Sequence, residues 1–145
     1  MTVNKRNDQI ITTLFEGASN SLLTGKETGS KMLSVNEITL DRGAKSEYYE
    51  IANVEESLFV TEGQITFRLG DNIFTAYKGD CVLAKRSQGH GYENSGASNA
   101  VIITVSPSTE INKNIIDEPK FSKSLPENGF FDRSKKEPFE FAPGI

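Results

Sequence analysis

Short apolar runs separated by polar turn signals fill the chain from Met32 to Ser106. The runs are rich in β-branched and aromatic residues, and Gly, Asp or Asn closes them, which predicts β-strands joined by tight turns. Gly63-Gln64 and Gly70-Asp71-Asn72 are the tightest hairpin signals, because glycine accepts the positive φ of such turns. Many short strands with close turns predict an all-β antiparallel sandwich or barrel. The expected strands cover residues 32–40, 46–51, 56–61, 64–69, 73–77, 81–84, 90–93 and 100–106.

The two flanking segments lack this strand pattern. Residues 1–30 are polar and rich in Ser, Thr and Gly, and they predict an N-terminal arm or an edge strand beside a barrel over residues 31–106. Residues 107–145 hold all 5 prolines, which keep this extension out of a central sheet. The extension also holds aromatics, which argue against plain disorder. It is therefore expected to pack on the barrel or to wrap a partner subunit through Phe121, Phe130, Phe131, Phe139 and Phe141.

Composition narrows the classes of function. A chain of 145 residues can bury a core as one domain without disulfides or metal. The net charge of −4 and the absence of a Lys/Arg block give little support for nucleic-acid binding. No apolar run approaches the roughly 18 residues of a membrane span, and no signal-peptide apolar region follows the N-terminus. The single cysteine, Cys81, cannot form an internal disulfide, so a cytoplasmic location is expected.

Two spaced motifs carry the candidate chemistry. The first consists of Gly43, Tyr49, Ile51, Glu56 and Gly63, with intervals of five, one, four and six residues. The second consists of Gly79, Lys85, Ser87, His90 and Asn94, with intervals of five, one, two and three residues. These spacings resemble the two motifs of the cupin family, G-x5-H-x-H-x(3–4)-E-x6-G and G-x5-P-x-G-x2-H-x3-N. The resemblance covers about residues 32–106 and implies a single-domain cupin, a jelly-roll β-barrel.

The departures from the family pattern affect the positions that bind the metal in cupins. In cupins, two histidines and a glutamate of the first motif and one histidine of the second hold a divalent metal. Here Tyr49 and Ile51 replace the two histidines, and only Glu56 and His90 remain. Two protein ligands are fewer than the three that a catalytic zinc site keeps. The resemblance therefore implies no firmly held metal and no cofactor, a ligand loss similar to that of the ethanolamine-utilisation cupins.

Strand alternation predicts what faces the interior. Tyr49 and Ile51 share one face, as do His90 and Tyr92, and the expected interior is apolar with a few polar groups. A cavity of this composition is typical of small-molecule sites. We take His90, Glu56, Tyr49 and Tyr92 as candidate catalytic residues, with Ile51 lining the ligand site. The alternative is that Glu56 and His90 only satisfy each other's hydrogen bonds.

A basic turn precedes the strand of His90. Lys85 stands where the family pattern has proline and Ser87 where it has glycine, and Lys85 is a candidate for binding a carboxylate or phosphate at the barrel mouth. A solvated surface turn is the alternative.

The resulting hypothesis is a cupin barrel that binds a small polar metabolite, with an anionic ligand as one option, and forms a homodimer. As an enzyme it would be a metal-independent isomerase, dehydratase or lyase, with His90 as general acid or base, Glu56 as its partner and Tyr49 or Tyr92 as second proton donor. A non-catalytic ligand-binding or accessory cupin is the first alternative. A metal-dependent enzyme with an unusual ligand set is the second.

Overall fold

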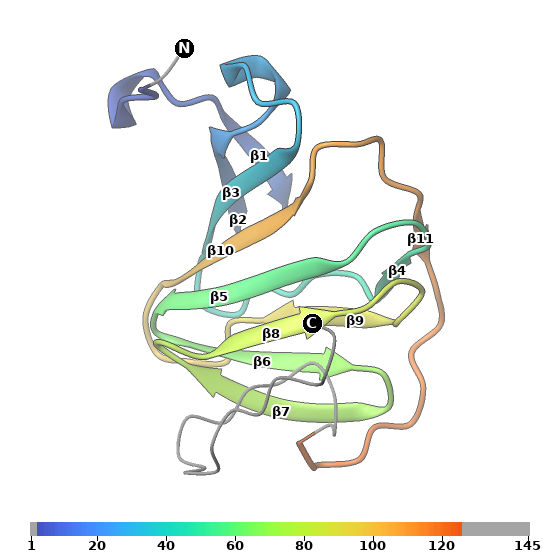
Figure 1. Cartoon of the computed structure of the whole chain (residues 1–145). Helices are drawn as coiled ribbons and strands as arrows, with labels where there is room; N and C mark the ends of the chain where they lie inside the picture. Colours follow the sequence, from blue (N-terminus) through green and yellow to red (C-terminus); the bar gives the residue numbers. More distant parts are fainter. Residues whose placement is uncertain (1–2, 126–145) are drawn as a thin grey trace, which may run out of the picture.

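Two antiparallel sheets face each other and enclose the core (Figure 1). The structure is a computed structural model and describes residues 3–125. The larger sheet has the strand order β1 (Ile11–Phe15), β2 (Ala18–Thr24), β3 (Leu33–Leu40), β10 (Ala100–Pro107), β5 (Glu56–Glu62) and β8 (Cys81–Ala84). The smaller sheet has the order β11 (Lys113–Ile115), β4 (Tyr49–Ile51), β9 (His90–Glu93), β6 (Gln64–Leu69) and β7 (Asn72–Tyr77). Two short 3-10 turns, η1 (Arg6–Asp8) and η2 (Lys26–Thr28), lie near the N-terminus.

The expected all-β jelly-roll class is confirmed, and each of the eight expected strands has a counterpart. The largest difference is at residues 46–51, where β4 begins only at Tyr49. The residues before it still follow the barrel wall, because the backbone N–H of Ser46 donates to the carbonyl of Tyr92. Tyr48, just before β4, is buried, and its hydroxyl donates to the Gly70 carbonyl at 2.6 Å. No helix within the described residues is long and apolar enough to cross a membrane.

The core follows the period of two that strands impose. In β10, Ala100 and Ile102 are fully buried, whereas the intervening Val101 is half-buried. The smaller sheet contributes the matching buried face, including Ile65 and Phe67 of β6. Burial of these side chains is the main favourable term in folding, and it fixes which residues of the neighbouring strands can reach the interior.

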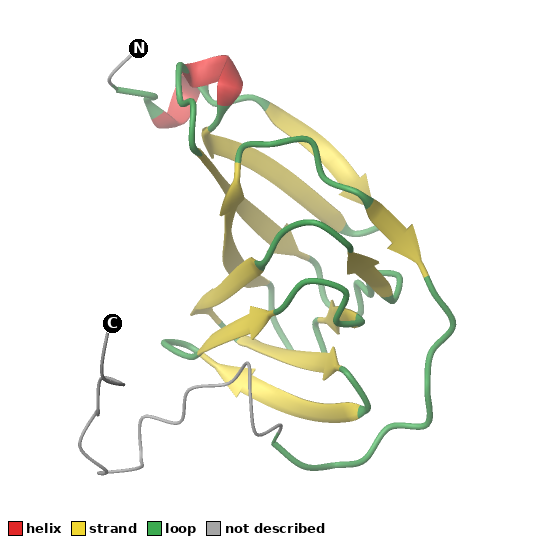
Figure 2. Cartoon of the chain, turned by 45° about the vertical axis from the view of Figure 1, so that its right-hand side comes forward, coloured by secondary structure: helices red, strands yellow, loops and turns green. Residues whose placement is uncertain are grey.

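Residues outside the expected barrel complete both sheets. The segment expected to be an arm or edge strand contains β1 and β2, a hairpin that adds to β3 and leaves β1 at the sheet edge. After β10 the chain crosses to the smaller sheet, where β11 pairs with β4 (Figure 2). It then runs on to β7, where Ser122 bridges Asn72, and the Phe121 ring packs edge-on against Tyr48 at 5.6 Å. The other four expected anchors, Phe130, Phe131, Phe139 and Phe141, lie outside the described residues.

A second contact anchors this C-terminal segment. Arg68 of β6 is almost fully buried, and its guanidinium donates to the Ser46 carbonyl at 2.8 Å and pairs with Glu118. A buried guanidinium needs such partners, because an uncompensated charge is costly in the interior. Glu118 thus neutralises a core charge from outside the expected barrel.

Candidate functional site

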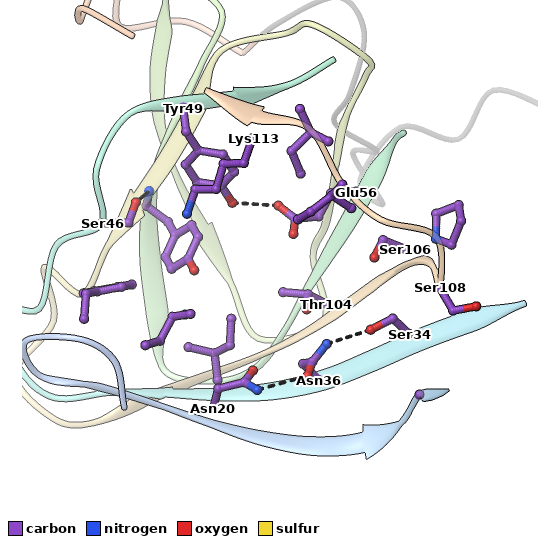
Figure 3. Close-up of a pocket in the computed structure, with 18 of the residues that line it drawn as sticks. Asn20, Ser34, Asn36, Ser46, Tyr49, Glu56, Thr104, Ser106, Ser108 and Lys113 are labelled. Atoms are coloured by element: carbon purple, nitrogen blue, oxygen red, sulfur yellow. Dashed lines mark hydrogen bonds between the residues drawn. The ribbon is translucent and has the colours of Figure 1, made fainter. Parts of the chain in front are cut away.

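A cavity of about 630 Å³ opens between the sheets near β11. Figure 3 shows the side chains that line it, which come from both sheets and from the β10–β11 crossover. The volume lies within the range of small-molecule sites. Four residues anticipated for the interior, Tyr49, Ile51, Glu56 and Tyr92, line this cavity.

The Glu56 carboxylate lines the cavity and has two hydrogen-bond partners. The Tyr49 hydroxyl donates to Oε1 of Glu56 at 2.7 Å, and Nε2 of His90 lies 3.0 Å from the same oxygen. Both contacts use Oε1, and within residues 3–125 no hydrogen bond reaches Oε2. Glu56 can therefore present Oε2 to a ligand while Oε1 is held.

His90 lies behind this wall. Its side chain is 3% exposed and does not line the cavity. The Tyr49 ring packs on the imidazole with centroids 4.3 Å apart. Both His90 and Glu56 were expected at the cavity, and of these two only Glu56 lines it.

The hydrogen bonds of His90 constrain where protons lie. Nδ1 is 2.9 Å from the carbonyl oxygen of Gln88, which can only accept, so Nδ1 carries a proton. The contact between Nε2 and Glu56 Oε1 requires one further proton, held by either atom. The imidazole and carboxylate therefore share one exchangeable proton next to the cavity.

Tyr92 supplies a polar group without a protein partner. It is 3% exposed, lines the cavity and packs against Phe15 and Phe67. Among the described residues no hydrogen bond reaches its hydroxyl, and this oxygen is not one of the fully buried atoms that lack a partner. Because Tyr92 lines the cavity, its hydroxyl is available to a ligand or water there.

The two inward tyrosines remain protonated over a wide pH range. Burial raises the pKa of Tyr49 well above 10.0, and the neighbouring charge of Glu56 raises it further. Burial and the Glu56 charge also raise the pKa of Tyr92. Both groups are therefore neutral hydrogen-bond donors near neutral pH.

These pKa shifts predict an alkaline loss of stability. A tyrosine whose folded pKa exceeds its unfolded pKa stabilises the native state fully below the unfolded pKa, near 10.0, and this contribution is lost as pH rises above it. We expect the free energy of unfolding to fall above about pH 10, by roughly 1 kcal/mol per pH unit for each tyrosine. The Tyr49→Phe/Tyr92→Phe variant should fall less steeply. Urea unfolding across this pH range measures the free energy of unfolding, and tyrosinate absorbance follows the ionisation of the tyrosines. Equal slopes of this free energy against pH for wild type and the double variant would contradict the burial argument.

Polar residues on the larger sheet form the opposite wall. The side-chain amide of Asn20 donates to Asn36 at 3.0 Å, and that of Asn36 donates to Ser34 at 3.2 Å (Figure 3). Thr104 and Ser106 lie directly across from Asn36 and Ser34 in the β3–β10 ladder. Sequence reasoning missed these residues, although a signal exists: the inward face of both strands changes from apolar to polar toward the same end.

Three lysines also line the cavity: Lys26, Lys45 and Lys113. The Lys113 ammonium lies over the Tyr49 ring, 4.3 Å from its centroid (Figure 3). Lys113 follows the expected barrel, and no local pattern marks it as a site residue. The pairing of β11 with β4 brings it to the cavity.

Lys85, which was expected to bind an anionic group of the ligand, does not line this cavity. It lines a separate surface pocket with Arg86 and Ser87. Ser87, at the motif position of a glycine, has φ +59°, the left-handed conformation that glycine adopts without strain. Asn94, the last motif residue, is buried and its amide donates to the carbonyls of Leu40 and Ser98. The second motif therefore contributes turn geometry and hydrogen bonding as well as His90.

Within residues 3–125, no three His, Cys, Asp or Glu side chains converge as a metal-binding group. At the position of the family's metal, the donor set is one carboxylate, one imidazole and one phenol, beside the hydrocarbon of Ile51. The raised pKa of Tyr49 keeps the phenol neutral, which makes it a poor ligand.

Comparison with known proteins shows which family and which solved structures this chain resembles. The family model described as a cupin domain matches residues 36–106. No curated protein matches significantly. The structure is similar to KdgF from Halomonas sp. (TM-score 0.67, 14% identity, covering 76% of this chain and 96% of that chain). It is also similar to a cupin-superfamily sugar phosphate isomerase from Silicibacter pomeroyi (0.66, 23%, 75% and 76%). A third similar structure is the polyketide cyclase RemF from Streptomyces resistomycificus (0.68, 14%, 83% and 90%).

These likenesses concern the fold, since all three identities are below 25%. The family match spans β3 to β10 and includes both motifs, from Gly43 to Asn94. The described strands form the two facing sheets that the motifs imply. Residues 36–106 of the chain therefore form a domain that belongs to the cupin family.

Proposed function

We propose that the cavity binds a small polar metabolite and that Glu56 transfers a proton to or from it. One observation carries this proposal: Glu56 lines the cavity with Oε1 held by Tyr49 and His90, while Oε2 has no hydrogen bond among the described residues. A positioned carboxylate with an open oxygen can act as a general base.

The surrounding groups suit an isomerisation. Oε2 of Glu56 would take a proton from a carbon next to a carbonyl, and the carbonyl oxygen would gain negative charge. The neutral Tyr92 hydroxyl can donate to that oxygen, because Tyr92 lines the same cavity and its hydroxyl has no hydrogen-bond partner among the described residues. Return of the proton to the former carbonyl carbon, together with transfer of the hydroxyl proton of the adjacent carbon to the former carbonyl oxygen, completes an isomerase reaction. Loss of a leaving group from the intermediate instead gives a dehydratase or lyase.

His90 is a positioning residue in this scheme. Its Nδ1–H is tied to the Gln88 carbonyl, and its Nε2 shares a proton with Glu56. The imidazole can thus supply or accept that proton as Glu56 changes charge. Tyr49 keeps Oε1 oriented through its hydrogen bond.

The proposed chemistry does not use a divalent metal. The site offers one carboxylate and one imidazole, which bond to each other, together with a neutral phenol and the side chain of Ile51. This set does not fit a catalytic zinc site, which keeps three ionic or imidazole ligands, or a hard-cation cage of carboxylates. A metal-dependent enzyme is therefore the less supported alternative.

The walls favour a ligand with several hydroxyl groups. Asn20, Asn36 and Thr104 offer amide and hydroxyl groups opposite Glu56. The similar structure from Silicibacter pomeroyi is a sugar phosphate isomerase. We therefore expect the ligand to be a small sugar or sugar derivative.

The test is a substrate screen in D2O. Wild-type protein is incubated with aldoses and ketoses of about five or six carbons, free and phosphorylated. Proton NMR then records deuterium incorporation and product formation. The proposal predicts enzyme-dependent exchange at a carbon next to the carbonyl for at least one compound. Saturable binding without exchange or turnover would instead support a non-catalytic accessory cupin, in which the Tyr49–Glu56–His90 bonds are structural.

The homodimer remains a proposal, supported by one surface. Val35, Phe59, Ile103 and Val105 lie on the outer face of the larger sheet, and Phe59 is 40% exposed. A second copy would cover this apolar strip. We expect Phe59→Glu to be monomeric and Tyr77→Glu, an exposed site on β7, to remain dimeric. Analytical ultracentrifugation distinguishes them; a monomeric wild type would contradict the dimer.

A further inference from the structure

Lys113 is a cation of the cavity without an acidic partner. It lines the cavity, and within residues 3–125 no carboxylate forms an ion pair with it. Its ammonium contacts the face of the Tyr49 ring. A cation–π contact leaves N–H groups free to donate, so the ammonium can bind an anion without first breaking an ion pair.

The position of Lys113 is set by backbone bonds on both sides. Asn53 brackets the preceding residues, since its amide donates to the Glu110 carbonyl at 2.8 Å and its oxygen accepts from the Asn112 N–H at 2.9 Å. On the other side, the Ile116 N–H donates to the Tyr48 carbonyl at 3.1 Å. Lys113 pairs across the ladder with Ile51, so the two side chains share the inward face.

Lys113 also lies beside the reacting group. Its ammonium contacts the ring of Tyr49, whose hydroxyl donates to Glu56. A ligand anion bound to Lys113 would therefore lie at the Glu56 end of the cavity. Within residues 3–125 no ion pair joins the Lys113 ammonium to Glu56 or to another carboxylate, so its charge is left to the ligand.

We propose that Lys113 binds an anionic group of the ligand, a phosphate or a carboxylate, and so selects negatively charged metabolites for this site. The inference rests on the proposed function of the site, but it concerns how the ligand is bound and not how a proton is transferred. It moves the anion contact from the Lys85 turn of the second motif to the segment that follows the barrel.

Inorganic phosphate is the probe, added at constant ionic strength against chloride and followed by two-dimensional amide NMR. Wild-type protein should show saturable shifts at Ile51, Asn112 and Lys113. In Lys113→Met the apparent affinity should fall at least about tenfold, as expected for loss of one charge-assisted contact. Lys120→Met is the matched control, because Lys120 is exposed on the same segment and does not line the cavity.

Two results would overturn the inference. One is a Lys113→Met titration equal to that of wild type, and the other is a wild type without saturable shifts near β4 and β11. The same spectra show whether each variant is folded. Phosphate has no carbon-bound proton, so its binding is scored independently of proton transfer. An inactive enzyme that binds phosphate through Lys113 and an active one that does not are therefore distinguished.

Discussion

Glu56→Gln should lose turnover of any substrate found in the screen by about 10²- to 10⁴-fold, the usual contribution of general acid–base catalysis. The amide cannot accept a proton at the open position that Oε2 occupies in wild type. Its oxygen can still accept from the Tyr49 hydroxyl, which lies 2.7 Å from Oε1, so the wall should keep its geometry. Initial rates and substrate binding measured on the same samples separate the two effects: kcat should fall while affinity changes little.

Two comparison variants sharpen this result. Glu55→Gln changes the adjacent carboxylate, which is exposed and faces the separate surface pocket, and it should retain full turnover. His90→Gln should lose less than Glu56→Gln, because His90 lies behind the wall and acts through the carboxylate. Glu56→Gln turnover within tenfold of wild type would rule out Glu56 as the base. A larger loss for His90→Gln would return the acid–base role to the histidine.

Strand alternation could predict which side chains face inward but not how deep they lie. Tyr49, Ile51, Glu56 and Tyr92 all reach the cavity as alternation requires. His90 has the same parity as Tyr92, yet the Tyr49 ring and the Glu56 carboxylate separate it from the ligand space. Depth depends on side-chain packing across two strands, and a single-strand pattern does not contain that information.

The polar wall of the cavity has a signal in the sequence of β3 and β10. Along β3 and β10, the inward positions pass from Leu40 and Ala100, both fully buried, to Asn36 and Thr104. A core strand whose inward face turns polar at one end marks the mouth of a barrel, because unpaired polar groups are costly deeper inside.

The contribution of the C-terminal segment had no such signal. β11 has only three residues, all exposed, so it shows no alternation. Lys113 reaches the cavity because β11 pairs with β4, and Glu118 forms an ion pair with the buried Arg68. Both partners lie more than forty residues earlier in the chain. Such contacts follow from tertiary structure, and local propensity cannot predict them.

Gly91→Ala should destabilise the fold by about 2–3 kcal/mol, the upper part of the usual cost of overpacking, because the site is rigid. A Cβ at Gly91 would lie 2.6 Å from Nη2 of Arg68 and 2.9 Å from the backbone oxygen of Glu47. Neither neighbour can move easily. The guanidinium is buried and bound to the Ser46 carbonyl and Glu118, and the Glu47 oxygen belongs to the chain leading into β4.

Gly25→Ala is the matched control, because its Cβ would meet only side-chain ends, Cδ1 of Leu22 at 3.0 Å and Oε2 of Glu27 at 3.3 Å. It should cost less than about 1 kcal/mol, since flexible side chains can shift. Urea denaturation of both variants gives the difference directly. If Gly91→Ala were as stable as Gly25→Ala, the buried guanidinium would have room to move. The Arg68–Glu118 pair would then not fix the spacing between β9 and β6, which sets where His90 and Tyr92 stand.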